Sequence, residues 1–235
     1  EDKIYFIESH NKETLHGQQT LENLLSNGSS IVCLDANTGK QVWRREHNIK
    51  DLRHTANLAA ANGILICNGS KNINESKRGD KKRSKGQVLY KLLTMDCETG
   101  ELLWEKEMNP NLKGGGSHGE ADRRPVIVGS KVYLEPFCYD LISGKDDKEF
   151  TYNINRRRGC GQMTASSKAL FFRNATAGGF DLKTNKIERL TTTTRPGCWL
   201  NMIPASGLLL IPEASSGCVC NFAIQTSLAF RPAAK

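Results

Sequence analysis

Residues 114–125 hold the densest group of side chains that could do acid–base or metal chemistry. A Gly-rich stretch at 114–116 precedes His118, Glu120 and Asp122. A flexible loop that presents an imidazole and two carboxylates could exchange protons or bind a metal ion. The simpler interpretation is a polar loop whose charged groups bond to the backbone and to neighbouring arginines, and we favour it. His118, Glu120 and Asp122 are therefore candidate catalytic residues, and no metal site is expected.

Two groups of arginines could bind an anionic ligand. Arg123 and Arg124 follow that loop directly, and Arg156 and Arg157 begin a run of three. Guanidinium groups bind carboxylates and phosphates through paired hydrogen bonds, although surface arginines are more often simply solvated. These four arginines are the candidate ligand-binding residues.

The eight cysteines fall into two sets. One set lies singly in or beside predicted strands, where a thiol packs as a small hydrophobic group, and we expect it to be free: Cys33, Cys67, Cys97 and Cys138. The other set lies in Gly-rich or turn-like surroundings: Cys160, Cys198, Cys218 and Cys220. We expect disulfides in this second set, formed in an oxidising compartment, and all three pairings stay open. Free thiols or a metal site are the alternatives, but one C-x-C and two isolated cysteines lack the paired knuckles of structural zinc sites.

Charge and hydropathy exclude two classes of partner. The net charge is +8, but residues 71–87 alone carry seven Lys and Arg against two acidic residues. We expect this segment to be a solvated, mobile loop insertion, and we expect no nucleic-acid partner, because the rest of the chain is only weakly basic. No apolar run approaches the roughly 20 residues of a membrane-spanning helix.

A recurring segment predicts the architecture. Residues 31–43 and 92–104 align without a gap, and weaker copies begin at 137 and 179. The shared residues are the aspartates Asp35, Asp96, Asp140 and Asp181, the glycines Gly39, Gly100 and Gly144, and the tryptophans Trp43 and Trp104. The aspartates are 61, 44 and 41 residues apart, and leaving out the 17-residue basic segment makes the period nearly constant.

Each copy predicts a β-hairpin. The aspartate begins a tight turn by accepting hydrogen bonds from backbone amides, and the glycine supplies a positive φ. Asn185 takes the place of the glycine in the fourth copy. The tryptophan provides a large apolar side chain to fill the space between neighbouring sheets.

Further strands are expected between these copies, at 63–67, 126–128, 131–134, 169–172 and 208–211. One helix is expected, at 13–25, as a surface insertion. Four strands in about 44 residues, repeated along the chain, are typical of a β-propeller blade.

The segment LDANTGKQVW at 34–43 resembles the pyrroloquinoline-quinone (PQQ) type repeat of quinoprotein alcohol dehydrogenases, which also occurs in cofactor-free bacterial propellers such as the outer-membrane assembly lipoprotein. Residues 195–230 resemble the end of large planctomycete-type propeller proteins of unassigned function. The resemblance implies an all-β fold, a β-propeller of PQQ-like four-stranded blades. About five blades are visible, as part of a seven- or eight-bladed ring.

We expect residues 1–235 to form a single propeller domain or a fragment of one, with the basic insertion at 71–87 and Cys-rich C-terminal blades at 156–232. Sheet faces left exposed at both ends would be covered by further N-terminal blades or by self-association.

Two functions are compatible with this resemblance. Quinone-dependent dehydrogenases of the family carry an adjacent Cys-Cys disulfide beside the cofactor, and Cys218 and Cys220 are separated by Val219. We therefore expect a module that is not an enzyme: a binding or scaffolding propeller, secreted, periplasmic or extracellular, with an unknown protein or small-molecule ligand and no cofactor. The alternative is a quinone- or metal-dependent oxidoreductase that uses PQQ or a metal ion at a site partly outside this chain.

Overall fold

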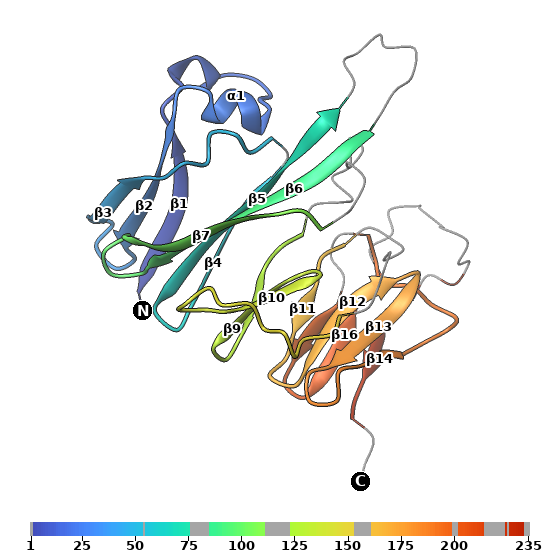
Figure 1. Ribbon diagram of the computed structural model, residues 1–235. Coiled ribbons are helices and arrows are strands. Elements are labelled where there is room, and N and C mark those ends of the chain that lie inside the picture. Colours follow the sequence, from blue (N-terminus) through green and yellow to red (C-terminus); the bar gives the residue numbers. More distant parts are fainter. Residues whose placement is uncertain are drawn as a thin grey trace. The chain divides into compact units, whose positions relative to one another are not determined.

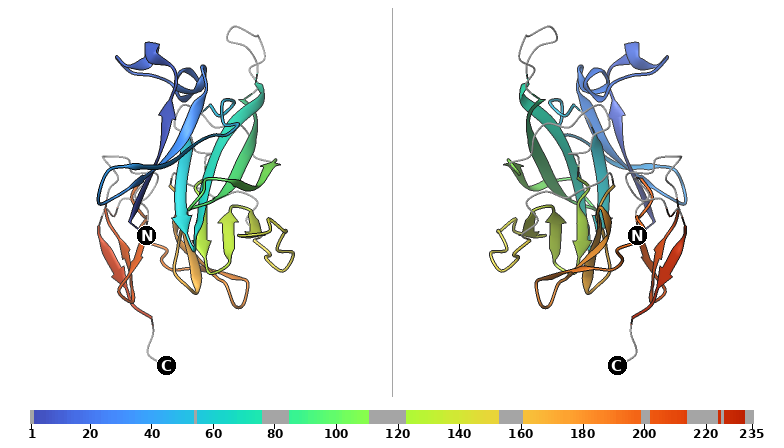
Figure 2. Two further views of the ribbon diagram at one scale, coloured as in Figure 1. Left: turned by 90° about the vertical axis from the view of Figure 1, so that its left-hand side faces the viewer. Right: turned by 90° about the vertical axis from the view of Figure 1, so that its right-hand side faces the viewer.

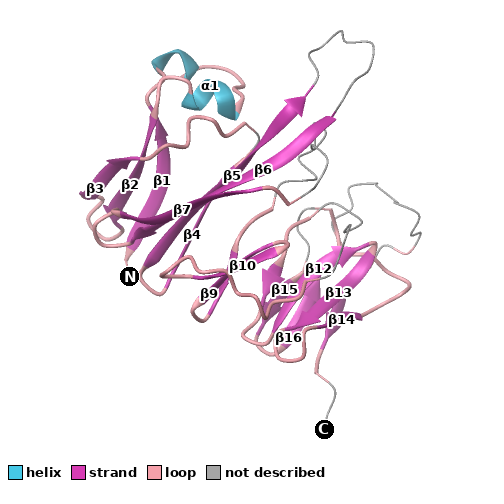
Figure 3. Cartoon of the chain, in the orientation of Figure 1, coloured by secondary structure: helices cyan, strands magenta, loops and turns pink. Residues whose placement is uncertain are grey.

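The chain is almost entirely β-structure (Figures 1 and 3). The computed structural model describes residues 2–53, 55–75, 85–110, 123–152, 161–198, 202–213, 224 and 226–232. It divides into two compact units, one formed by Glu1–Asp122 with Tyr139–Lys145 and the other by Arg123–Cys138 with Asp146–Lys235. Within the described part, no helix is long and apolar enough to cross a membrane.

The first unit contains two antiparallel sheets whose strands pair in chain order (Figure 1). The first sheet comprises β1 (Lys3–Ser9), β2 (Ser29–Asp35) and β3 (Gln41–Glu46). The second comprises β4 (Ala56–Ala61), β5 (Ile64–Glu75), β6 (Lys85–Asp96) and β7 (Leu102–Met108). The two sheets bury a common core that includes Ile31, Trp43, Leu65, Leu93 and Met95.

The expected helix at 13–25 is much shorter than predicted. A 3-10 turn, η1 (Lys12–Thr14), and one short helix, α1 (Leu21–Leu25), lie between β1 and β2. Thr20 caps α1, because its side chain accepts a hydrogen bond from the backbone N–H of Asn23 at 3.2 Å. Leu25 is fully buried in the core of the first unit, so this segment contributes to the core as well as to the surface.

The basic segment 71–87 is in part an extension of a hairpin. Residues 71–75 continue β5 and residues 85–87 begin β6, so the expectation of a loop insertion is wrong for both of these stretches. Residues 71–75 contain one apolar residue, Ile73, and residues 85–87 contain none, so no apolar alternation indicated these strands. They pair with each other across the hairpin. Residues 76–84 lie outside the described part of the chain.

The second unit contains three antiparallel sheets, again with strands paired in chain order. The first of them comprises β8 (Val126–Val128), β9 (Lys131–Leu134) and β10 (Phe137–Asp140), and the last two residues of β10 belong to the first unit. The second comprises β11 (Thr164–Ala165), β12 (Ala169–Asn174), β13 (Thr176–Asp181) and β14 (Lys186–Arg189). The third comprises β15 (Ile203–Ala205), β16 (Leu208–Ile211) and β17 (Leu228–Phe230). Strand β11 contacts both β8 and β15, so the first strands of three successive sheets are neighbours. Figure 2 shows the ribbon from two further sides. Strands meet in this way at the inner edge of propeller blades.

The prediction of an all-β propeller fold is confirmed, since the described residues form five antiparallel sheets. Two of these sheets have the predicted four strands and three have three strands. The strands expected at 126–128, 131–134 and 208–211 have those bounds, whereas the strands expected at 63–67 and 169–172 are longer. A single domain over 1–235 and a ring of seven or eight blades stay predictions.

The four repeat turns have the same hydrogen bonds. Asp35 Oδ1 accepts from the backbone N–H of Thr38 at 2.7 Å and from its hydroxyl at 2.8 Å, and Thr99, Ser143 and Thr184 donate in the same way to the other three aspartates. The residue four places after each aspartate has a positive φ, between 55° and 71°: Gly39, Gly100, Gly144 and Asn185. The predicted turn geometry is therefore present in every copy.

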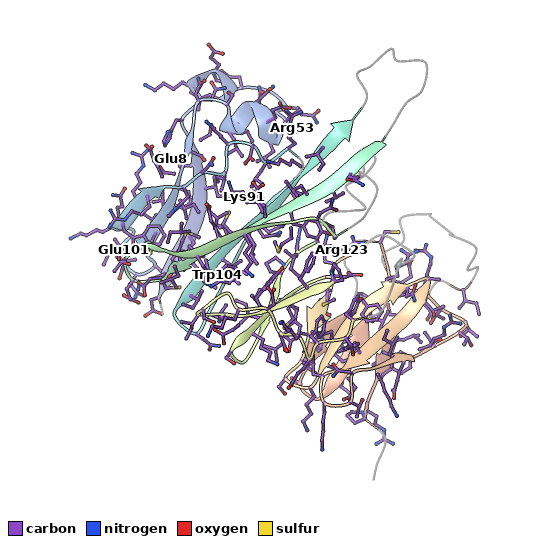
Figure 4. All side chains as sticks on the ribbon, viewed as in Figure 1. Glu8, Arg53, Lys91, Glu101, Trp104 and Arg123 are labelled. Atoms are coloured by element: carbon purple, nitrogen blue, oxygen red, sulfur yellow. The ribbon has the colours of Figure 1, made fainter. Side chains whose placement is uncertain are left out.

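Each repeat tryptophan is bonded to the turn of the next copy. The Trp43 Nε1–H donates to the carbonyl of Cys97 at 2.9 Å, and the Trp104 Nε1–H donates to the carbonyl of Leu141 at 3.1 Å. Trp104 is labelled in Figure 4. A Cβ added at Gly100 would lie 2.6 Å from the Trp43 ring, and one at Gly144 would lie 2.7 Å from the Trp104 ring. Glycine is therefore required at these two turns both for its φ and for the space that the indole occupies.

The link between the third and fourth copies is made differently. Lys148 stands where the first two copies have tryptophan. Phe150 instead packs edge-on against Phe180, with ring centroids 5.2 Å apart. The side-chain amide of Asn185 donates to the carbonyl of Glu149 at 3.1 Å. An aromatic contact and a hydrogen bond are therefore kept, with other residues.

Substitutions at two glycines distinguish the cost of placing a side chain at a positive φ from the cost of a clash with the indole. Gly39 and Gly100 both have a positive φ, but a Cβ at Gly39 would meet nothing within 4 Å. We expect Gly39→Ala to lower the free energy of unfolding by about 1–2 kcal/mol and Gly100→Ala by a further ~1–3 kcal/mol, because only the second overpacks against Trp43. Urea unfolding monitored by circular dichroism measures both, and equal losses would contradict the indole contact.

The repeat turns also predict a pH dependence of stability. Hydrogen bonds from the Thr or Ser three residues later lower the pKa of Asp35, Asp96, Asp140 and Asp181. A carboxyl whose pKa is lower in the folded than in the unfolded chain stabilises the fold at pH values above its ordinary pKa of 3.8. This stabilisation is lost as the pH falls through the pKa of the folded chain.

We therefore expect the free energy of unfolding to decrease below about pH 4, and Asp96→Asn and Asp140→Asn to make that decrease smaller. Urea titrations between pH 5 and pH 2.5 measure it. The control is Glu101→Gln, which removes an exposed carboxyl and leaves in place the backbone hydrogen bonds of Glu101 to Thr99 and Asp96. An unchanged slope in both Asp variants would contradict the role of the charged turns.

Candidate functional site

Two buried arginines meet at the thiol of Cys198 in the second unit. Arg173 belongs to β12 and is 2% exposed, and Arg195 follows β14 and is 5% exposed. The Nη1 group of each donates to the Cys198 Sγ at 3.4 Å. Two cations taken out of water therefore share one sulfur atom.

The position of this cluster follows from strand alternation. Leu170 and Phe172 of β12 are buried in the core shared with the sheet of β8–β10, and Phe171 packs in the core shared with the sheet of β15–β17. Arg173 is two residues from Phe171, so it lies on the same face as Phe171. Residues 194–197 are buried, and Cys198 is the partly exposed residue that follows them.

The arginines determine the ionisation of the thiol. Burial alone would raise the pKa of Cys198, but the hydrogen bonds and charges of Arg173 and Arg195 outweigh it and lower that pKa. The other described cysteines behave in the opposite way, because burial raises their pKa, to about 12 for Cys67 and Cys138. Cys198 thus has the thiolate character that nucleophilic and redox-active cysteines share.

Arg195 has hydrogen-bonding capacity left over. Its Nε and Nη2 groups are buried and have no hydrogen-bond partner among the residues that the structure describes. Buried N–H donors without a partner are costly, so this guanidinium is suited to holding an additional oxygen atom.

The predicted ligand-binding arginines have different surroundings. Arg123 forms a buried ion pair with Glu135, with 3.2 Å between Nε and Oε2 (Figure 4). Arg124 is exposed, and its backbone N–H donates to the side-chain oxygen of Gln162 at 2.8 Å. Neither contact tests whether these arginines bind a ligand, so that role stays a prediction.

The other predicted site residues lie outside the described part of the chain: His118, Glu120, Asp122, Arg156, Arg157, Cys160, Cys218 and Cys220. Their roles stay predictions. Within the residues that are described, no three His, Cys, Asp or Glu side chains are grouped so that they could hold a metal ion.

The disulfide prediction is not supported at Cys198. The structure has this residue as a free cysteine, and hydrogen bonds from two arginines occupy its sulfur. Cys33, Cys67, Cys97 and Cys138 are free and buried, as predicted. Gly-rich surroundings, which suggested a disulfide, are equally compatible with a thiol held by cations.

Sequence reasoning missed Arg173 and Arg195. The one available signal was the charge within the apolar strand sequence ALFFRN, where Arg173 interrupts the run of hydrophobic residues.

Sequence reasoning also missed an ion cluster in the first unit, where Asp51 lies 2.5 Å from the Nζ of Lys71 and 3.8 Å from the Nζ of Lys91. Its members are far apart in the chain, so no spacing pattern could have indicated it.

A third feature is the apolar outer face of the last sheet. Ile203, Leu208 and Leu210 are 49%, 40% and 36% exposed. Ile203 pairs with Leu210, and Leu210 pairs with Ala229, so their side chains form a row across the three strands on one face. The opposite face of the same sheet buries Leu209 and Ile211 against Ala177 and Met202. Among the residues that the structure describes, one face of this sheet is therefore covered and the other is not.

Comparisons with known proteins give a limited similarity. No protein-family model matches the sequence, and no curated protein matches it. The crystal structure of BamB from Moraxella catarrhalis is similar, with 15% sequence identity and a TM-score of 0.47. The match covers 86% of this chain and 55% of that one, so the chain spans about half the length of the solved structure. The comparison concerns fold only.

The state of Cys198 can be tested by mapping thiols. We expect alkylation in denaturant without reductant to label Cys198 together with Cys33, Cys67, Cys97 and Cys138, since the structure has all five as free cysteines. Mass spectrometry before and after reduction assigns each site. Labelling of Cys198 only after reduction would contradict the free thiol and restore the disulfide.

Proposed function

We propose that the chain is a non-catalytic binding or scaffolding module built on PQQ-type propeller blades, and that it acts by protein contact at the uncovered face of its last sheet. The observation that carries this proposal is that the sheet of β15–β17 is apolar on both faces while only one face is buried. Contiguous exposed apolar surface of this kind marks protein interaction sites.

The sheet of β11–β14 indicates what kind of surface the uncovered apolar face of β15–β17 is suited to contact. The sheet of β11–β14 buries Leu170 and Phe172 on one face and packs Phe171 on the other. It is apolar on both sides because it has a sheet on both sides. By the same argument, the uncovered row of Ile203, Leu210 and Ala229 is suited to a further antiparallel sheet.

We assign a second copy of this chain as the partner. The first sheet also has an exposed apolar pair, Ile4 and Phe6, next to each other on one face of β1. Ile4 pairs with Leu34 and Phe6 pairs with Val32, so this face is apolar across two strands. A first sheet from one copy and a last sheet from another would cover both apolar faces, and such a head-to-tail contact generates rings or filaments.

The PQQ-type assignment and a periplasmic or extracellular location are parts of this proposal. The repeated Asp–Thr–Gly turn with its docked indole supports the repeat type. The location rests on the family resemblance of the sequence, and fractionation of cells that express the full-length gene tests it.

The experiment for the proposed contact is analytical ultracentrifugation over a range of concentrations. We expect the wild-type chain to associate, and Leu208→Lys and Phe6→Lys each to increase the dissociation constant at least about tenfold, because each places a charge in an apolar contact. Ile142→Lys is the matched control, since Ile142 is 67% exposed on a turn of the first unit.

A wild-type chain that stays monomeric at all concentrations would contradict self-association. So would equal effects of Leu208→Lys and Ile142→Lys. Circular dichroism shows whether each variant is folded, and substitution at such exposed positions is expected to change the free energy of unfolding by no more than about 0.5 kcal/mol.

The non-catalytic assignment has its own test. Absorbance spectra and metal analysis of the purified protein distinguish it from a quinone- or metal-dependent oxidoreductase. A bound quinone or a stoichiometric metal ion would overturn the assignment.

A further inference from the structure

We propose that Cys198 is a modification site at which a hydroperoxide oxidises the thiol to a sulfenic acid, with Arg173 and Arg195 as positioning residues. The inference goes beyond the proposed function and does not depend on it. It rests on three features of the cluster: two buried cations, one sulfur that both of them contact, and unused donors next to that sulfur.

The first step concerns the ionisation of the sulfur. Arg173 and Arg195 are both more than nine-tenths buried, and both donate to Sγ at 3.4 Å. Buried guanidinium groups keep their charge, so an anionic partner is strongly preferred to a neutral one. The thiolate is the form that attacks a peroxide, and the lowered pKa of Cys198 increases its fraction at neutral pH.

The second step concerns access. Cys198 is partly exposed, whereas the other four described cysteines are buried. A small hydroperoxide can reach Cys198 from solvent, but it cannot reach the sulfurs of Cys67 or Cys138 without local opening. Exposure and thiolate character thus coincide at one residue, as they do in redox-sensitive cysteines.

The third step concerns the charge that develops during the reaction. The Cys198 thiolate attacks the terminal O–H oxygen of the hydroperoxide, the S–O bond forms, the O–O bond breaks, and the attacked oxygen keeps its hydrogen in the sulfenic acid. The electron pair leaves on the second oxygen, as hydroxide from hydrogen peroxide or as an alkoxide from an alkyl hydroperoxide, and an acid of the buffer neutralises it. The sulfur is oxidised by two electrons and the peroxide is reduced. The Nε and Nη2 donors of Arg195 have no described partner and can hydrogen-bond the leaving oxygen.

The test uses hydrogen peroxide on the full-length, pre-reduced chain, with dimedone to trap sulfenic acid and tandem mass spectrometry to locate it. We expect a dimedone adduct at Cys198 and none at Cys67 or Cys138 in the folded protein. At pH 6.5 we expect Cys198 to be oxidised at least about fivefold faster in the folded chain than in the urea-unfolded chain, where the arginines no longer act on it.

Variants test the role of the arginines. We expect Arg195→Gln to slow oxidation of Cys198 at least about fivefold and to move the pH profile of iodoacetamide labelling to higher pH, and Arg195→Lys to restore part of the rate because it keeps the charge. Arg189→Gln is the matched control, since Arg189 is an exposed residue of β14 in the same unit.

Three results would overturn the proposal: a Cys198 that is no faster in the folded than in the unfolded chain, a dimedone adduct equally strong at the buried cysteines, or an unchanged pH profile in folded Arg195→Gln. If Arg195→Gln does not fold, the comparison of folded and unfolded wild-type chain decides. Self-association measured separately is unaffected by any of these results, so the two proposals can fail independently.

Discussion

The contact between an indole and the turn of the next repeat is the constraint on which the first unit depends. Trp43 donates to the Cys97 carbonyl and occupies the space beside Gly100, and Trp104 does the same with Leu141 and Gly144. One tryptophan side chain thus holds each repeat against the turn of the next repeat, by a hydrogen bond and by packing against the glycine. The aspartate and glycine of each turn are needed because they form the surface that receives the ring.

Sheets stacked in this way must be apolar on both faces. Strand β12 shows the result, with Phe172 buried in one core and Phe171 packed in the next. Arg173 breaks the pattern on the face that Phe171 shares, and the break coincides with a partly exposed thiol and a second buried arginine. Departures from an otherwise regular pattern are the places where chemistry is most expected.

The sequence predicted the fold well because its signals are local. Each turn is specified within five residues, by Asp35 and Gly39 in the first copy and by Asp96 and Gly100 in the second. In the first copy Trp43 comes four residues after the glycine. The site could not be predicted in the same way, because Arg173 and Cys198 are 25 residues apart and meet only through the packing of β12 against the segment after β14. The ends of the basic segment were misjudged because the stretches that extend β5 and β6 have only one apolar residue between them, so no alternation marked them as strands.

The replacement of tryptophan by Lys148 has a consequence for how the chain opens. In repeat proteins, cooperativity is transmitted by nearest-neighbour contacts, and a change in the type of contact marks a boundary between segments that unfold separately. The division of the chain falls within this third copy, with Tyr139–Lys145 in the first unit and Asp146 onward in the second. Amide hydrogens of the Asp140 turn should therefore exchange together with those of β6 and β7, on a timescale distinct from the amides of β12 and β13.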